Sequence, residues 1–119
     1  MILADTSVWV RHLRQGDSVL TRLLDENLLL IHPFVIGELA CGNLLQREEI
    51  LSHFETLPAA KISEHDEVMQ LIKSKRLFGK GLGWIDAHLL ASAALSHAKL
   101  WTLDKALQRS SAALGINFN

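Results

Sequence analysis

Apolar residues recur along the chain in two patterns, short runs and longer segments. The short runs predict strands, because each is brief and is bounded by polar or turn-forming residues. They cover Leu3–Asp5, Leu28–Ile31, Ala60–Ile62 and Lys99–Leu103. The longer segments predict helices over Ser7–Arg14, Ser18–Glu26, Phe34–Cys41, Arg47–Leu57, Ser63–Phe78, Trp84–Ala98 and Lys105–Leu114.

Strands that alternate with helices favour an α/β fold, a three-layer sandwich around a mostly parallel central sheet. Pro33 suits the first turn of its helix, where its missing N–H has no partner in any case. Ser63 and Asp66 resemble a capping box at the start of another helix. The chain shows no repeat, linker or low-complexity tract, so residues 1–119 are expected to form a single domain.

The composition fits a compact globule. Hydrophobic residues make up 49% of the 119 residues, enough for a buried core. No apolar stretch approaches the roughly 18 residues that span a membrane, and residues 1–20 lack the pattern of a secretory signal. The single Cys41 cannot form an internal disulfide and is expected in the core. These features predict a cytoplasmic protein.

The net charge of −1 does not indicate a nucleic-acid binder. Any affinity for a polyanion would therefore come from local basic patches or from metal ions. The segment KSKRLFGKG is one such patch, and we predict RNA contacts from Arg76 and Lys80, with Arg11 as a further candidate. The alternative for this segment is a solvated helix end.

Four of the thirteen acidic residues stand alone in apolar surroundings: Asp5, Glu38, Asp86 and Asp104. Asp5 and Asp104 end predicted strands, and the active crevice of a parallel α/β sheet lies beyond the carboxyl ends of its strands. Burying four carboxylates separately would strain a domain whose net stability is roughly 5–15 kcal/mol. A shared divalent cation would supply the missing positive charge. Oxygen ligands without clustered Cys or His favour Mg²⁺ or Mn²⁺ over Zn²⁺.

Each acid also has a structural explanation. Asp5 and Asp104 can cap the helices that follow them, and Asp86 gains from the dipole at the start of its helix. Glu38 has no such explanation, because it is expected inside a helix. For the four together, a shared site is the favoured interpretation.

These residues resemble a known family. The segments Asp5-Thr6-Ser7, the lone Glu38, Gly83-Trp84-Ile85-Asp86-Ala87 and Thr102-Leu103-Asp104 are similar to those of PIN-domain proteins. More narrowly, the chain resembles the VapC-type ribonuclease toxins of bacterial and archaeal toxin–antitoxin pairs. The resemblance runs nearly end to end, and the order and spacing of the acids match.

The resemblance implies a metal-dependent endoribonuclease whose Mg²⁺ or Mn²⁺ ligands are the four acids, chiefly Asp5 and Asp86. It implies that the hydroxyls of Thr6, Ser7 and Thr102 orient those carboxylates. The implied substrate is transfer RNA or a ribosomal RNA loop. The implied partners are a cognate antitoxin and a second copy of the chain in a homodimer.

The chain departs from many of these relatives in one place. They carry another acid shortly after the fourth, whereas Lys105 follows Asp104 here. We therefore expect one tightly bound ion, with a second recruited by RNA.

Two other functions are consistent with the same residues. One is a PIN nuclease of RNA maturation that has no antitoxin. The other is a catalytically silent PIN-like module that binds RNA or protein. The intact set of four acids argues against the silent module, which has no need of mutually repelling carboxylates.

Overall fold

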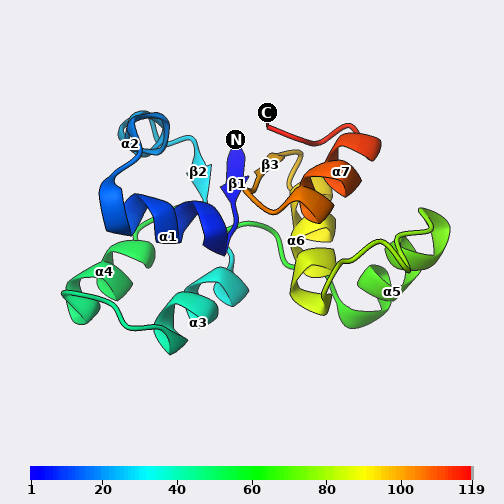
Figure 1. Ribbon diagram of the computed structural model, residues 1–119, viewed down its shortest axis with the longest axis horizontal. Coiled ribbons are helices and arrows are strands. Elements are labelled where there is room, and N and C mark those ends of the chain that lie inside the picture. Colours follow the sequence, from blue (N-terminus) through cyan, green and yellow to red (C-terminus); the bar gives the residue numbers. More distant parts are fainter. Residues whose placement is uncertain (119) are drawn as a thin grey trace.

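The fold is built on a short parallel sheet that lies between two groups of helices (Figure 1). The computed structural model describes residues 1–118. The elements are β1 (Ile2–Ala4), α1 (Thr6–Gln15), α2 (Ser18–Asp25), β2 (Leu29–Leu30), α3 (Pro33–Cys41), α4 (Arg47–Phe54), α5 (His65–Ser74), α6 (Trp84–Leu95), β3 (Lys99–Trp101) and α7 (Lys105–Ala113). This architecture confirms the predicted α/β class with a parallel sheet.

The strand order is β2-β1-β3, and both pairs are parallel. Ile2 is in register with Leu29 on one side and with Lys99 on the other. Helices α1, α3 and α7 begin shortly after β1, β2 and β3, respectively. Because parallel strands end at the same edge, the residues that join these strands to their helices gather there.

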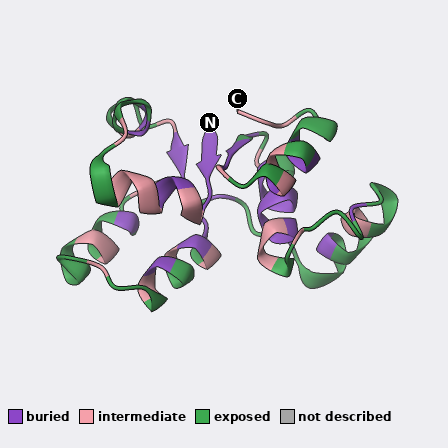
Figure 2. Cartoon of the chain, viewed as in Figure 1, coloured by how far each residue is buried: buried purple, intermediate pink, exposed green. Residues whose placement is uncertain are grey.

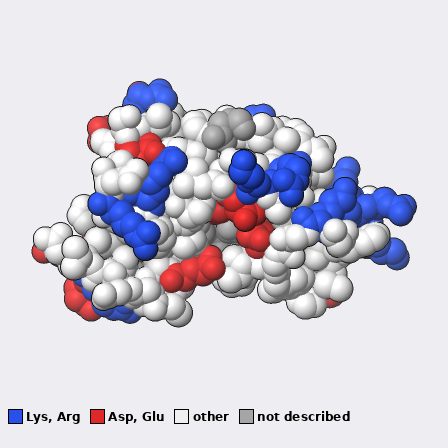
Figure 3. All heavy atoms as spheres, in the orientation of Figure 1, with Lys and Arg blue, Asp and Glu red and all other residues white. Residues whose placement is uncertain are grey.

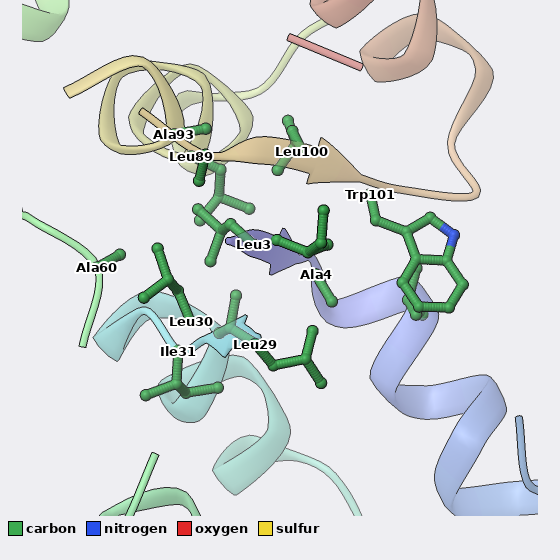
Figure 4. Packing of buried hydrophobic residues seen from close by; sticks show 14 of the residues in the cluster. Leu3, Ala4, Leu29, Leu30, Ile31, Ala60, Leu89, Ala93, Leu100 and Trp101 are labelled. Carbon is green, nitrogen blue, oxygen red and sulfur yellow. The ribbon is translucent and has the colours of Figure 1, made fainter. Parts of the chain in front are cut away.

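The core surrounds this sheet. The strands are almost wholly buried (Figure 2), as expected for a parallel sheet covered on both faces. Leu3 and Ala4 of β1 are fully buried, and α6 packs on β1 and β3 with Leu89 and Ala93 turned toward the strands (Figure 4). The apolar runs of the sequence therefore form the central layer, which fixes the positions of the polar residues at its edge.

The predicted strand at Ala60–Ile62 is wrong. The chain makes an isolated parallel bridge between Ala59 and Ile31, with the Ala60 N–H donating to the Ile31 carbonyl at 2.9 Å. The next N–H, of Lys61, donates to the Ser96 hydroxyl at the end of α6. This bond draws the chain away from the sheet before a strand can continue.

The predicted capping box at Ser63 and Asp66 is also wrong, because α5 begins later. The Glu64 N–H donates to Glu67 Oε1 at 2.7 Å, and Ser63 is buried ahead of the helix. The helix ends at Ser74 rather than at Phe78.

Other elements differ from prediction only at their ends, by a few residues. Helix α6 ends at Leu95, and His97 with a φ of +54° turns the chain into β3. Cys41, expected in the core, is exposed at the end of α3. Among the described helices, none combines the length and apolar character that crossing a bilayer requires.

Candidate functional site

Asp5 lies at the carboxyl end of β1 and is the centre of a hydrogen-bonded cluster. The residue is buried, with a relative exposure of 6%. Ser7 Oγ donates to Oδ1 and Thr102 Oγ1 donates to Oδ2, each at 2.5 Å. The N–H of Val8 donates to Oδ1 at 3.3 Å, so Asp5 also caps α1. Burial raises the pKa of the Asp5 carboxyl above its ordinary value, although these hydrogen bonds oppose the increase.

The two hydroxyls around Asp5 also tie β1 to the loop after β3. Ser7 Oγ accepts the Leu103 N–H at 3.0 Å, and Thr102 Oγ1 accepts the Asp104 N–H at 3.0 Å. The Asp5 N–H itself donates to the Trp101 carbonyl. Asp5 and Asp104, far apart in the sequence, are therefore held in adjacent positions by one network.

Glu38 joins this region from α3. Thr6 Oγ1 donates to Glu38 Oε1 at 2.6 Å, which links the first residue of α1 to the middle of α3. Glu38 is exposed, and its helix position offers no capping role. Its carboxylate is instead directed to the strand edge by a hydroxyl beside Asp5.

Asp86 and Asp104 stand at the starts of two helices. Asp86 Oδ2 accepts the Gly83 N–H at 2.9 Å ahead of α6, and Asp104 Oδ2 accepts the Leu107 N–H at 2.9 Å in α7. Asp5 does the same for α1. The capping explanations given to Asp5 and Asp104 therefore hold, as does the position given to Asp86 at the start of its helix. Positive helix termini stabilise all three carboxylates.

The expectation that all four acids are buried is wrong. Asp5 is buried and Asp86 half-buried, whereas Glu38 and Asp104 are exposed. The reason is that helix starts and one helix face open toward solvent at the edge of the sheet. Acidic atoms lie in the middle of the face shown in Figure 3, with basic side chains on both sides.

The donor set suits a hard divalent cation, since it consists of carboxylate and hydroxyl oxygens. Hydrogen bonds within the described residues occupy one oxygen each of Glu38, Asp86 and Asp104 and leave the other open. Across residues 1–118, no three acidic, imidazole or thiol side chains come together closely enough to enclose a single ion in this conformation.

The three predicted RNA-contact residues lie in different environments. Arg11 pairs with Asp17 at 2.7 Å, so part of its guanidinium is already engaged. The Arg76 guanidinium lies 6.0 Å from the Phe78 ring centroid. Lys80 is exposed in the glycine loop before α6 and lines a pocket with residues of α7.

Two residues that hold the site in place were not predicted from the sequence. Gln108 Nε2 donates to the Thr102 carbonyl at 2.9 Å and fixes the loop that carries the Asp5-binding hydroxyl. His32 caps α3, accepting the Phe34 N–H on Nδ1 at 3.0 Å. The His32–Pro33 pair, a polar residue ahead of a helix-starting proline, was a local signal for that cap.

Comparison with known proteins identifies the family of the chain. The family model of the PIN domain matches residues 2–112. The chain therefore belongs to the PIN-domain family, and within it to the VapC-type proteins. It is 46% identical over 117 residues to Ribonuclease VapC32 of Mycobacterium tuberculosis, in both strain CDC 1551 / Oshkosh and strain ATCC 25618 / H37Rv. Each alignment covers 98% of this chain and 94% of the relative.

Proposed function

We propose that this protein is the endoribonuclease toxin of a toxin–antitoxin pair and hydrolyses RNA phosphodiester bonds at the four-carboxylate edge of its sheet. The observation that carries the proposal is the buried Asp5 carboxylate, held by two hydroxyls at the end of β1. A carboxylate with a raised pKa at the mouth of a parallel sheet is typical of a functional site. The likeness to a relative named as a ribonuclease supports RNA as the substrate.

Asp5 and Asp86 would be the principal ligands of Mg²⁺ or Mn²⁺, with Glu38 and Asp104 completing the site directly or through water. Such an ion, when bound, neutralises phosphate charge and lowers the pKa of a water molecule. The acidic edge would otherwise repel RNA. The same cation would offset the desolvation that now raises the pKa of Asp5.

The protein's own groups supply orientation. Ser7 and Thr102 hold both oxygens of Asp5, and Gln108 holds the backbone at Thr102. The open oxygen of Asp104 or Glu38 would accept a proton from the attacking water and align it with the phosphorus. Water attack leaves a 5′-phosphate and a 3′-hydroxyl.

No histidine is needed for this reaction. His88 lies two residues after Asp86 but is buried against Phe34 and Trp84, with ring centroids 4.8 and 4.7 Å away. It packs with aromatic side chains and is shielded from solvent. A metal-free mechanism, in which the RNA 2′-oxygen attacks with histidine assistance, is therefore disfavoured.

The antitoxin would bind across α1, α3 and α4. A hollow of about 670 Å³ begins at Thr6 and Glu38 and continues past Val10 and Leu13 to Leu45. A second hollow, of about 290 Å³, shares Leu13 and is lined by Trp9 and Phe54. An amphipathic segment lying there would cover apolar surface and bring a basic side chain to the carboxylates.

Two parts of the proposal rest on the family alone. They are the choice of transfer RNA or a ribosomal RNA loop as target, and the homodimer. The Lys105 that follows Asp104 is consistent with one tightly bound ion, since it supplies positive charge where a further carboxylate would stand.

The test is cleavage of total cellular RNA by the purified protein with Mg²⁺, with Mn²⁺ and with EDTA. We expect discrete fragments with 5′-phosphates in the presence of either ion, and none with EDTA or with Asp86→Asn. The asparagine retains an oxygen that can accept the Gly83 N–H, so α6 should keep its start. Asp66→Asn, an exposed acid in the first turn of α5, is the matched control and should cleave normally. Full activity of Asp86→Asn would overturn the assignment.

A further inference from the structure

A basic pocket lies beside the acidic edge, between the end of α5, the glycine loop and α7. It has a volume of about 280 Å³, and its charged lining residues are Lys75, Lys80 and Arg109. Leu77 and Leu114 provide apolar walls. In Figure 3, basic side chains gather over α7 and over the region where α5 ends.

The three cations are unpaired in the part of the chain that the structure describes. None of them makes an ion pair or a side-chain hydrogen bond with residues 1–118, and no carboxylate lines the pocket. Like charges gathered around one concavity repel one another unless an anion lies between them. The pocket is therefore complementary to a phosphate group.

An exposed aromatic residue directly follows one of the residues that line this pocket. Phe78 comes after Leu77 and lies between Lys75 and Lys80 in the sequence, with a relative exposure of 59%. Arg76 lies over its ring. Exposed aromatic and arginine planes beside a basic groove are the elements with which proteins bind single-stranded nucleic acid, because unpaired bases stack on them.

The glycine loop connects the pocket to the proposed catalytic edge. Gly81 adopts a φ of +80°, and a side chain there would lie 3.4 Å from Cβ of Ala106, which lines the pocket. Ala106 follows Asp104 by two residues, and the same loop ends with the Gly83 N–H bonded to Asp86. Arg109 lies about 7.5 Å along the α7 axis from Asp104 and about 140° around it, at about 1.5 Å and 100° per residue. An RNA strand that follows the glycine loop would contact both places.

We propose that Lys75, Lys80 and Arg109 bind a backbone phosphate of single-stranded RNA and that Phe78 stacks an adjacent base, anchoring the strand beside the cleaved bond. This inference rests on the proposed nuclease function but concerns binding outside the four acids. It adds Arg109 to the predicted RNA contacts. It also assigns Lys80 to a phosphate and Phe78 to a base.

The binding test uses the full-length Asp86→Asn protein in EDTA with a fluorescent single-stranded RNA of about a dozen nucleotides. Affinity is measured by anisotropy over a series of salt concentrations. Lys80→Gln and Arg109→Gln should each reduce the slope of log K against log salt by about 0.7, and the double variant by about 1.4. Phe78→Ala should weaken binding about five-fold or more with little change in slope.

Matched controls lie elsewhere on the surface. Arg22→Gln on α2, Lys61→Gln before α5 and the exposed Ile62→Ala should change neither affinity nor slope. Thermal unfolding of each variant checks that the exposed substitutions leave the fold intact, and Lys75→Gln gives an independent third measurement of the pocket. Unchanged slopes in all three pocket variants would overturn the proposal. So would selective loss of binding to an acidic peptide while RNA binding stays the same.

Cleavage separates this inference from the proposed function. In the otherwise unmodified protein, Arg109→Gln should lower kcat/KM on RNA without moving the cut position. Cleavage without any effect of the pocket variants on binding would refute the pocket and keep the nuclease. Pocket-dependent binding by a protein that cleaves no RNA would refute the nuclease and keep the pocket.

Discussion

The Thr102 hydroxyl donates to Oδ2 of Asp5 at 2.5 Å, joining the loop after β3 to the end of β1. Thr102 Oγ1 also accepts the Asp104 N–H at 3.0 Å. One side chain therefore orients two of the four acids. It also satisfies a backbone donor that would otherwise be left without a partner at a partly buried position.

Thr102→Val should weaken both the fold and the activity. Valine keeps the volume but removes the donor to a buried carboxylate and the acceptor for the Asp104 N–H. We expect a loss of about 1–3 kcal/mol in the free energy of unfolding, measured by urea titration, together with reduced RNA cleavage. Thr102→Ser retains the hydroxyl and should keep most of both. Equal stability of the valine and serine variants would show that the hydrogen bonds contribute little.

Asp5→Asn should abolish cleavage and yet stabilise the metal-free protein at neutral pH. The raised pKa of Asp5 means that the folded state holds this proton more tightly than the unfolded state, whose value is near 3.8. The ionised carboxylate therefore costs stability as pH rises through the folded pKa, and this cost is absent below pH 3.8. Asparagine removes the charge. The gain in stability of Asp5→Asn should therefore appear as pH rises from 3.8 through the folded pKa of Asp5.

The measurement is the melting temperature in EDTA as a function of pH. An increase of roughly 4 °C at pH 7 would correspond to about 1 kcal/mol in a domain of this size. Asp66→Asn serves as the comparison, because its carboxylate is exposed and lies outside the candidate site. A lower melting temperature for Asp5→Asn at every pH would mean that the cap and hydroxyl contacts outweigh desolvation.

Gly81→Ala should destabilise the protein, whereas Gly37→Ala should not. Gly81 has a φ of +80° and approaches Ala106, so alanine there is strained. Gly37 lies within α3 with open space around it, and alanine favours a helix interior by up to about 1 kcal/mol. Denaturant unfolding of the two variants should give shifts of opposite sign. Unchanged or increased stability of Gly81→Ala would show that the glycine loop does not depend on its left-handed conformation.

The sequence predicted those parts of the site that depend on local signals. An aspartate after a buried apolar run marks both a strand end and a helix cap, so Asp5 and Asp104 were placed correctly at the edge of the sheet. Thr6, Ser7 and Thr102 were expected to hold the carboxylates, and in the structure their hydroxyls donate to Glu38 and Asp5. These hydroxyls were predicted from the family resemblance, because the pattern of apolar residues does not identify them.

Features that depend on contacts between distant segments were missed or misplaced. The strand expected at Ala60–Ile62 fails because Lys61 bonds to Ser96, a residue that only the folded chain brings near. Lys80 and Arg109 line the same pocket only because α7 packs beside the glycine loop. The acids were all expected to be buried because the sequence around them is apolar. Helix starts are open on one side, however, which local composition does not reveal.

Leu45→Arg should impair binding of the proposed antitoxin without affecting cleavage. Leu45 is 84% exposed and lines the hollow that leads to Glu38, so it is available to a partner and contributes little to the core. Arginine would place a charge in an apolar contact. Coexpression with the antitoxin should then fail to neutralise toxicity, and copurification should be lost. The exposed Met69→Arg on α5 is the control, and equal loss of neutralisation in that variant would argue against the proposed groove.

Protonation of His32 should make the protein less stable in mild acid. Its side chain is fully buried, and its Nδ1 accepts the Phe34 N–H that begins α3. Burial, reinforced by the neighbouring His88, lowers the pKa of His32 to about 4 from its ordinary value of 6.5. Because the folded state binds this proton less readily than the unfolded state, stability should be complete above pH 6.5 and fall as pH decreases toward 4. The full difference amounts to roughly 3 kcal/mol.

His32→Asn isolates this contribution, because asparagine is a good helix cap and can accept the same N–H without titrating. Its stability at pH 7 should be lower, since it fills the buried site less completely. Its decline between pH 6.5 and pH 4.5 should be shallower than that of the unmodified protein, when both are followed by thermal unfolding in the same buffers. Burial also lowers the pKa of His88, so a residual slope is expected in the variant. Identical slopes for the two proteins would assign the acid sensitivity to His88 or to other groups and would remove His32 as its source.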